Sequence, residues 1–303
     1  MIFINKEVIV IGILLMLPMV SYSKQSIVRG IITNTDEKPI NLCLIKATNS
    51  NLATYSNEQG TFSLEYDTDS SNSLIFICMG YESKEVKIYG DTLKVVLNRK
   101  VNKLNEVVVH AGNRGKIKHG VMGKKNLKPF GICTGHIGQE YAIFLGADSS
   151  RHGELETMYF YITKEGVPNS RFRVHVYDID TGYMPGSDLL DSIVILHANM
   201  GDEWVSADVS ARHVAVGRGV FISIEWILGY GNNPNLVTSK NFPAAGRFNG
   251  QVPAYTQDYY KQSSLLYIRK NAAMPWRYLF AAGSFKKNTL NPMVYATYTY
   301  YKR

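Results

Sequence analysis

The chain has 303 residues, which is sufficient for two domains with hydrophobic cores of their own. Its three cysteines cannot form a complete set of disulfides. Its formal net charge of +8 does not indicate a nucleic-acid partner, because much of it lies in one short run without interleaved aromatic residues.

Residues 1–23 predict a secretory signal peptide. A polar start that carries Lys6 precedes an apolar block at residues 8–20, and small residues follow it. The block is shorter than the roughly 20 residues that a membrane-spanning helix needs, and an uncleaved anchor is the alternative interpretation. We therefore expect an exported protein of the periplasm, the outer membrane or the extracellular space.

Short apolar or alternating segments separated by turn-forming residues predict an all-β chain, because helical periodicity is absent over comparable lengths. In the first half these segments indicate a small sandwich of about seven strands. The expected strands are residues 26–33, 41–48, 60–66, 73–79, 83–89 and 92–98.

The order of several residues in this half resembles the carboxypeptidase regulatory-like domain, a transthyretin-like sandwich common in Bacteroidetes envelope proteins. The matching points are Gly30, Pro39, residues 54–60 leading into Phe62, the pair Gly80 and Tyr81, and residues 104–109. The resemblance covers residues 26–109 and implies a seven-stranded sandwich. Gly60 fits this pattern as the turn of a hairpin, where its backbone can adopt a positive φ.

Cys43 and Cys78 lie inside strand-like segments, where a small thiol behaves as a hydrophobic residue. Buried free thiols are the favoured interpretation, and a disulfide between these two residues is the alternative. Cys133 lies near no second cysteine.

Residues 110–128 are basic and rich in glycine, which predicts a flexible linker. A solvated tether is the favoured role. Peripheral contact with anionic lipid or with the phosphates of lipopolysaccharide is the alternative.

Residues 129–303 again read as a series of strands and predict a larger, jelly-roll-like sandwich. Residues 172–190 and 220–227 resemble uncharacterised sandwich domains that follow the regulatory-like module in other envelope proteins, a resemblance that implies no activity. The expected strands are residues 157–163, 170–180, 192–198, 204–210, 219–227, 263–270, 277–283 and 294–302. Alternation places Phe172, Val174 and Val176 on one face, and Arg173, His175 and Tyr177 on the other.

No catalytic motif stands out. A zinc carboxypeptidase needs a His and a Glu three residues apart with a distant His, and neither His136 with Glu140 nor His152 with Glu154 fits. No Gly-x-Ser-x-Gly turn is present, and Cys133 with His136 has the wrong spacing for one face of a strand. We therefore expect a protein that is not an enzyme and needs no cofactor or metal.

Two acidic features leave alternatives open. Glu225 lies in the middle of a predicted strand, either as one acid of a glycan hydrolase or as the partner of a cross-strand Arg or Lys. Asp178 and Asp180 lie in an Asp-rich segment, which predicts a turn, with a structural calcium ion as the alternative.

Aromatic residues are numerous, with 20 tyrosines, and flat exposed rings can stack on sugars. We expect a ligand patch at Tyr259, Tyr260, Trp276 and Arg277, with packing as the alternative role for most aromatic residues. The sequence thus predicts a non-catalytic binding or assembly module of the cell envelope, for carbohydrate or another envelope protein. A glycan hydrolase that uses Glu225 and a purely structural adaptor are the alternatives.

Overall fold

The computed structural model describes residues 25–50, 52–100, 114–122, 138–146, 153–164, 168–169, 171–227, 255–256, 266–278 and 291–301. In these residues the regular elements are strands, apart from one short 3-10 turn, η1 (Ser210–Arg212). None of the described segments is a helix long and apolar enough to cross a membrane. The predicted all-β class is confirmed. The predicted signal peptide and Cys133 lie outside the described residues.

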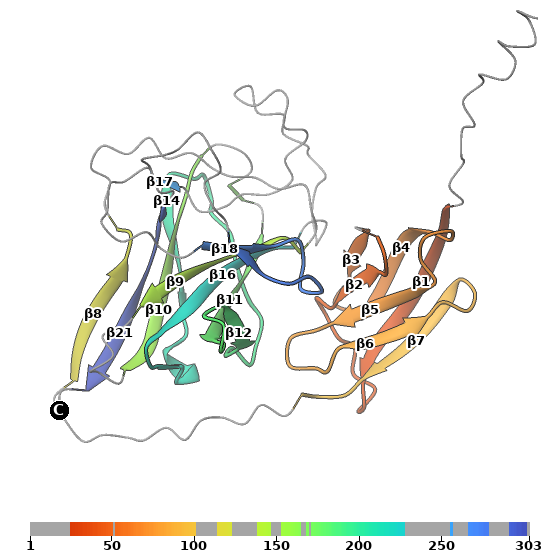
Figure 1. The fold of residues 1–303 in the computed structure, drawn as a ribbon, viewed down its shortest axis with the longest axis horizontal. Helices are drawn as coiled ribbons and strands as arrows, with labels where there is room; N and C mark the ends of the chain where they lie inside the picture. The colour runs from red at the N-terminus through yellow and green to blue at the C-terminus, as the bar shows by residue number, and fades with distance from the viewer. Residues whose placement is uncertain are drawn as a thin grey trace, which may run out of the picture.

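The N-terminal domain is a sandwich of two sheets, drawn in red to orange in Figure 1. One sheet has the strand order β4-β1-β7 and the other the order β3-β2-β5-β6, which confirms the expected seven-stranded sandwich. The strands are β1 (Gln25–Asn34), β2 (Leu44–Ala47), β3 (Ala53–Tyr55), β4 (Thr61–Asp67), β5 (Ser73–Ile77), β6 (Lys84–Lys87) and β7 (Thr92–Leu97).

Alternating side chains build the core of this domain. In β4 and β7 every second residue is buried, as the two-residue period of a strand with one covered face requires. The rings of Phe62 and Phe76 meet edge to face across the two sheets, with centroids 5.7 Å apart. Gly60 adopts the expected positive φ, +71°, in the turn before β4. The expected hairpin is wrong, because β3 and β4 belong to different sheets and this turn carries the chain from one sheet to the other.

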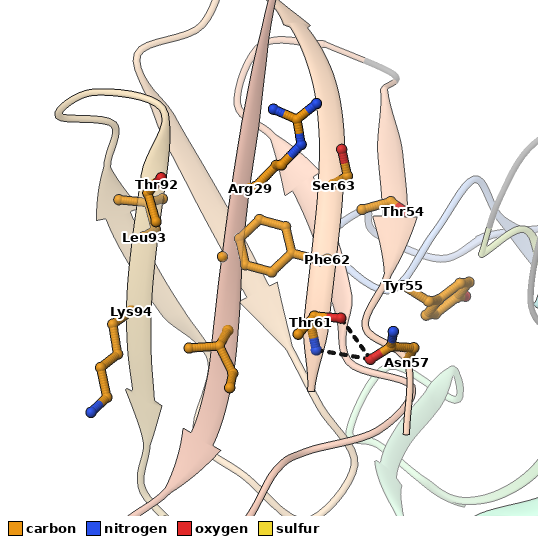
Figure 2. A pocket seen from close by; sticks show the side chains of 12 residues that line it. Arg29, Thr54, Tyr55, Asn57, Thr61, Phe62, Ser63, Thr92, Leu93 and Lys94 are labelled. Carbon is orange, nitrogen blue, oxygen red and sulfur yellow. Dashed lines mark hydrogen bonds between the residues drawn. The ribbon is translucent and has the colours of Figure 1, made fainter. Parts of the chain in front are cut away.

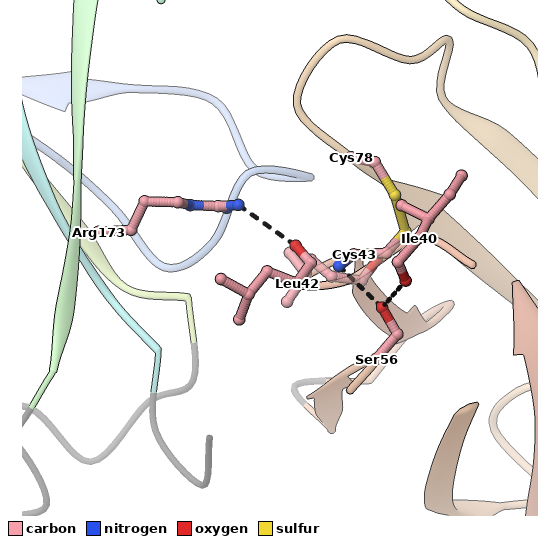
Figure 3. The surroundings of a disulfide bond; sticks show 7 residues. Ile40, Leu42, Cys43, Ser56, Cys78 and Arg173 are labelled. Carbon is pink, nitrogen blue, oxygen red and sulfur yellow. Dashed lines mark hydrogen bonds between the residues drawn. A yellow bond between two sulfur atoms is a disulfide. The ribbon is translucent and has the colours of Figure 1, made fainter. Parts of the chain in front are cut away.

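Cys43 and Cys78 form a disulfide, so the favoured interpretation of buried free thiols is wrong (Figure 3). Leu44 of β2 lies opposite Ile77 of β5, so the next pair along these antiparallel strands is Cys43 and Cys78. Their Cα atoms are 4.5 Å apart, within the range that a disulfide spans. The register of β2 and β5, which the sequence does not reveal, brings the two thiols together.

The C-terminal domain is a second sandwich, whose strands run from yellow to blue in Figure 1. Its larger sheet has the order β12-β11-β16-β9-β18-β19, with β13 also paired to β11. These strands are β9 (Glu140–Gly146), β11 (Phe172–Ile179), β12 (Pro185–Asp188), β13 (Val194–Leu196), β16 (Gly219–Trp226), β18 (Leu266–Arg269) and β19 (Arg277–Tyr278).

The smaller sheet of this domain has the order β14-β10-β21-β8, with β15 also paired to β10. Its strands are β8 (Arg114–Gly120), β10 (Gly153–Ile162), β14 (Glu203–Asp208), β15 (Ala215–Val216) and β21 (Val294–Tyr301). A separate pair consists of β17 (Tyr255–Thr256) and β20 (Asn291–Pro292). The chain passes repeatedly from one large sheet to the other, as expected of a jelly-roll-like sandwich.

One apolar core fills the space between the two sheets of the C-terminal domain. Val174 and Ile222 reach it from the larger sheet, and Met158 and Ala296 reach it from the smaller one. Phe172 and Val176 belong to the same core, as the alternation of β11 predicts. The opposite face of the seven-stranded sheet therefore carries Arg173, His175 and Tyr177, and we call it the outer face.

Part of the predicted linker is a strand. Residues 114–120 form β8, which pairs antiparallel with β21 and ends the described part of the smaller sheet. Lys116 forms an ion pair with Glu156, and the ammonium of Lys118 lies 5.9 Å from the centre of the Tyr295 ring. A basic, glycine-rich segment is thus ordered by a backbone ladder and by partners on the neighbouring strands, which composition alone does not reveal.

Candidate functional site

Four charged residues form a row across the outer face of the seven-stranded sheet. Each comes from a different neighbouring strand, and each lies directly opposite the next: Arg173 of β11, Glu225 of β16, Glu140 of β9 and Arg269 of β18. Both glutamates and Arg173 are almost fully buried, since Glu225 is 1% exposed and Arg173 is 4% exposed. Each of the four charged side chains in this buried row therefore needs an oppositely charged or hydrogen-bonding partner.

The two arginines neutralise the two glutamates from the outer ends of the row. Arg173 donates from Nε to Oε2 of Glu225 at 2.5 Å, and a second contact joins its Nη2 to the same oxygen. Arg269 donates from Nε to Oε2 of Glu140 at 2.6 Å. Glu140 and Glu225 face each other on adjacent strands, a destabilising arrangement for like charges that these ion pairs offset.

Neutral groups and one histidine complete the hydrogen bonds of the carboxylates. Tyr177 and Ser223 both donate to Oε1 of Glu140, at 2.7 and 2.5 Å. His175 lies between two carboxylates, with Nε2 2.9 Å from Glu225 and Nδ1 2.7 Å from Asp188. The row is therefore a closed network in which each carboxylate has several partners.

The network determines how these groups ionise. Burial alone would raise the pKa of Glu225, but the guanidinium of Arg173 and the bond to His175 hold that pKa well below its usual value. Burial alone would lower the pKa of His175, but the carboxylates of Asp188, Glu140 and Glu225 raise it to about 9. His175 is therefore a cation and Glu225 an anion at neutral pH.

The N-terminal domain closes one end of this row. Tyr55 of β3 donates from its hydroxyl to Oε1 of Glu225 at 2.6 Å. Arg173 donates from Nη1 to the backbone oxygen of Leu42 at 3.2 Å, a contact that Figure 3 shows beside the disulfide. Leu42, Leu44 and Tyr55 also pack against Ile227 in a small apolar cluster that spans both domains. The charged row thus serves as the docking surface for the N-terminal domain.

These surroundings do not suit Glu225 to be the general acid of a glycan hydrolase. A general acid needs access to substrate and a pKa that is not depressed, whereas Glu225 is buried and its pKa is lowered. Its partner is the cross-strand Arg173, as the alternative interpretation holds. Within the described residues, no group of three or more His, Cys, Asp or Glu side chains is arranged to hold a metal ion.

Asp178 lies near the end of β11, and Asp180 lies at the start of the turn that follows it. Oδ1 of Asp180 accepts bonds from the backbone N–H groups of Gly182 and Met184, both at 2.8 Å, and Oδ1 of Asp178 accepts one from Ser187. These carboxylates therefore organise the connection from β11 to β12, as the favoured interpretation predicts.

Of the expected ligand patch, the structure describes Trp276 and Arg277, whereas Tyr259 and Tyr260 lie outside the described residues. The guanidinium of Arg269 lies 4.3 Å from the centre of the Trp276 ring, and Tyr177 meets that ring edge to face at 5.6 Å. Trp276 thus packs over the pair of Arg269 and Glu140 and stays partly exposed, and its part in a ligand patch stays a prediction. Arg277 is exposed in β19.

A second aromatic group lies on the smaller sheet, on the face turned away from the core. We call Tyr159, Tyr161, Trp204 and Tyr295 the aromatic platform. The rings of Tyr159 and Tyr295 are stacked, with centroids 4.3 Å apart and planes 6° from parallel. Trp204 meets Tyr295 edge to face at 4.9 Å and Tyr161 at 5.3 Å. Tyr159, Trp204 and Tyr295 are partly exposed.

Polar side chains surround the platform. Ser206 lies opposite Tyr159 in the β10–β14 ladder, and Thr297 lies two residues beyond Tyr295 on β21, so both share its face. Lys118 reaches over the Tyr295 ring from β8. The combination of partly exposed rings, hydroxyls and one ammonium suits a ligand with both apolar faces and polar groups.

Tyr159 and Trp204 are not among the residues that the sequence singles out, although both lie in predicted strands. Alternation within residues 157–163 places Tyr159 and Tyr161 on one face, which is a usable signal. Trp204 and Tyr295 lie beside these two tyrosines only because of the order and register of the neighbouring strands, which the sequence does not reveal.

Comparisons with known proteins identify one of the two domains. The family model described as the CarboxypepD_reg-like domain matches residues 28–109. No curated protein matches the chain.

Solved structures with weak similarity include the cysteine protease and lectin-like domains of Cwp84, a surface layer associated protein of Clostridium difficile. That match has 13% identity and a TM-score of 0.37, and covers 82% of this chain and 45% of the other. A streptococcal ancillary pilin matches at 10% identity and a TM-score of 0.20, over 75% and 58% of the two chains. The chain therefore spans about half the length of these two proteins.

A carbohydrate-binding module of the β-sandwich superfamily matches at 12% identity and a TM-score of 0.16, over 69% of this chain and 94% of the other. Similarity of this order says nothing about activity or ligand. The family match, the seven-stranded sandwich and the position of its turns agree, and residues 28–109 are a CarboxypepD_reg-like domain.

Proposed function

We propose that this protein is a non-catalytic, exported binding module of the cell envelope, whose C-terminal sandwich binds a glycan on the aromatic platform. The observation that carries the proposal is the partly exposed set of rings at Tyr159, Trp204 and Tyr295. The predicted signal peptide and the family resemblance support export and an envelope location.

The chemistry of the platform suits a sugar. The C–H faces of a pyranose ring are apolar and pack on aromatic rings, whereas its hydroxyls need hydrogen-bond partners at the edge. Trp204 and Tyr295 supply rings, and Ser206, Thr297 and Lys118 supply polar partners on the same face. A binding surface of this kind needs no ionised catalytic pair.

The contacts on the outer face of the seven-stranded sheet support a structural role for that face over a catalytic one. Its buried carboxylates are fully engaged with arginines, hydroxyls and a histidine, and Tyr55 of the N-terminal domain completes the shell of Glu225. This face contacts the N-terminal domain, whereas the aromatic platform lies on the other sheet of the C-terminal domain.

A glycan array of the chain without its predicted signal peptide tests the proposal. We expect saturable binding to one class of glycan, and the Trp204→Ala and Tyr295→Ala variants should bind about tenfold more weakly, since stacking is worth roughly 0.5–1.5 kcal/mol beyond burial. A Trp204→Phe variant, which keeps a ring, should bind with intermediate affinity.

The matched control is Tyr89→Ala, which removes a tyrosine that is 78% exposed and lies in the N-terminal domain. Its binding should equal that of the unsubstituted protein. Absence of binding to every glycan on the array, or equal binding by all variants, would contradict the proposal. A protein partner in the envelope, sought by cross-linking, would then be the better hypothesis.

A further inference from the structure

A pocket of about 850 Å³ lies on the N-terminal domain, far in sequence from the aromatic platform. It opens on the sheet β4-β1-β7 beside β3, and Figure 2 shows its side chains. Pockets that hold small molecules in proteins have volumes of roughly 300–1,000 Å³. The space is therefore sufficient for an organic ligand larger than a single inorganic ion.

The lining of this pocket carries two positive charges and no acidic residue. Arg29 and Lys94 supply the charges. Threonine, serine and asparagine side chains supply polar groups, and Ile31, Phe62 and Leu93 supply apolar surface. The polar residues are Thr54, Asn57, Thr61, Ser63 and Thr92.

The register of three strands sets this arrangement. Arg29 of β1 lies between Ser63 of β4 and Thr92 of β7, and the next outward residue of β1, Ile31, lies between Thr61 and Lys94. Outward residues of β4 and β7 are exposed, as their alternating burial shows. The two cations thus come from adjacent strands, two residues apart along the sheet.

These cations differ from the arginines of the C-terminal domain. Arg173 and Arg269 are each bound to a buried carboxylate. Among the described residues, neither Arg29 nor Lys94 forms an ion pair with a carboxylate, and both side chains are exposed. Glu65 lies one step further along β4, opposite Ile27, and does not line the pocket. The pocket therefore offers two available cations, one toward each of its ends (Figure 2).

We propose that this pocket binds a sugar with acidic groups at both ends, one held by Arg29 and one by Lys94, whose charged ends point away from each other (Figure 2), while the surrounding threonine and serine side chains hold the sugar hydroxyls. The charge selects an anion, because a carboxylate or phosphate accepts short, charge-assisted hydrogen bonds from guanidinium and ammonium groups. The volume and the apolar lining favour an organic anion over a free ion. The pocket is independent of the aromatic platform.

Titration calorimetry on the chain without its predicted signal peptide tests the inference with four probes. Digalacturonic acid supplies carboxylates and glucose 6-phosphate supplies a phosphate. Comparing their affinities shows which acidic group the pocket prefers. Galactobiose is the neutral sugar, and inorganic phosphate is the free ion. We expect at least one of the two anionic sugars to bind saturably and more tightly than galactobiose or inorganic phosphate.

The Arg29→Gln and Lys94→Gln variants should each weaken that binding by about tenfold or more, as expected when a charged hydrogen-bond partner is lost. Lys87→Gln is the matched control, because Lys87 is an exposed lysine of β6 on the other sheet. It should change the affinity by less than about twofold, and the Tyr295→Ala variant should bind the probe as the unsubstituted protein does.

Three results would overturn the inference. These are no binding of either anionic sugar, equal binding of galactobiose or inorganic phosphate, and binding that is unchanged in both pocket variants. The two proposals are tested separately, because Tyr295→Ala changes only the platform. If the pocket binds no anionic sugar, the proposed function of the C-terminal sandwich still stands. If the platform binds no glycan, the proposal for the pocket still stands.

Discussion

His175 is a buried cation whose charge depends on three neighbouring strands. Asp188 of β12 and Glu225 of β16 contact its ring nitrogens, and Glu140 of β9 adds a further negative charge nearby. An unperturbed histidine titrates near pH 6.5, whereas these carboxylates raise the pKa of His175 to about 9. The folded protein therefore binds a proton that the unfolded chain releases at lower pH.

This difference predicts how stability changes with pH. The stabilising contribution of protonated His175 is fully present below about pH 6.5 and is lost as the pH rises through about 9. Urea unfolding should show a fall of the order of 3 kcal/mol in the free energy of unfolding over that range. The His175→Gln variant should show a flatter profile, and the exposed His197→Gln variant should keep the native one. Identical slopes for the native protein and His175→Gln would contradict the assignment.

At the scale of single residues, the sequence predicts which face of a strand a side chain occupies better than it predicts which residues that side chain contacts. Alternation correctly separates Arg173, His175 and Tyr177 from the core, and the mid-strand position of Glu225 indicates a cross-strand cation. That Glu140 lies directly beside Glu225 depends on the register of β9 and β16, which local pattern does not encode. Trp276 shows the same limit, because its packing role depends on Arg269.

At the scale of elements, most predicted strands agree with the observed ones, and the differences arise where long-range pairing determines the structure. β8 lies in a basic, glycine-rich segment and forms because β21 offers a free edge. Its residues Lys116 and Lys118 also find partners on neighbouring strands. The contact of this region with anionic lipid stays a prediction.

The disulfide between β2 and β5 makes a quantitative prediction. Cys43 and Cys78 are 35 residues apart, and closing a loop of that size restricts the unfolded chain by roughly 3–4 kcal/mol in the loop-entropy model. The double variant Cys43→Ser with Cys78→Ser should lower the free energy of unfolding of the N-terminal domain by about that amount. The measurement is urea unfolding, with the Cys133→Ser variant as the control for loss of a thiol. Equal stability of all three proteins would show that the disulfide does not form in solution.

At the scale of the whole molecule, the docking of the two domains depends on few contacts. Leu42 and Leu44 meet Ile227 in a small apolar cluster, and two polar contacts accompany it. Interfaces between domains of one chain are mobile by default unless they are large and apolar. The polar contacts from Tyr55 and Arg173 therefore carry much of the geometric restraint.

Tyr55 provides the sharpest test of that restraint. Burial and the nearby charge of Glu225 raise the pKa of Tyr55 well above its usual value, so that its hydroxyl stays protonated and donates to Glu225. The Tyr55→Phe variant keeps the ring and its packing but removes the donor, which should weaken docking by roughly 1.5–3 kcal/mol, as for other hydrogen bonds to charged groups. Hydrogen exchange should then increase in β3 and at the end of β16, whereas the core of each sandwich stays protected. The control Tyr89→Phe changes an exposed tyrosine and should leave exchange unaltered. Unchanged protection of β3 and β16 in Tyr55→Phe would mean that the apolar cluster alone holds the domains together.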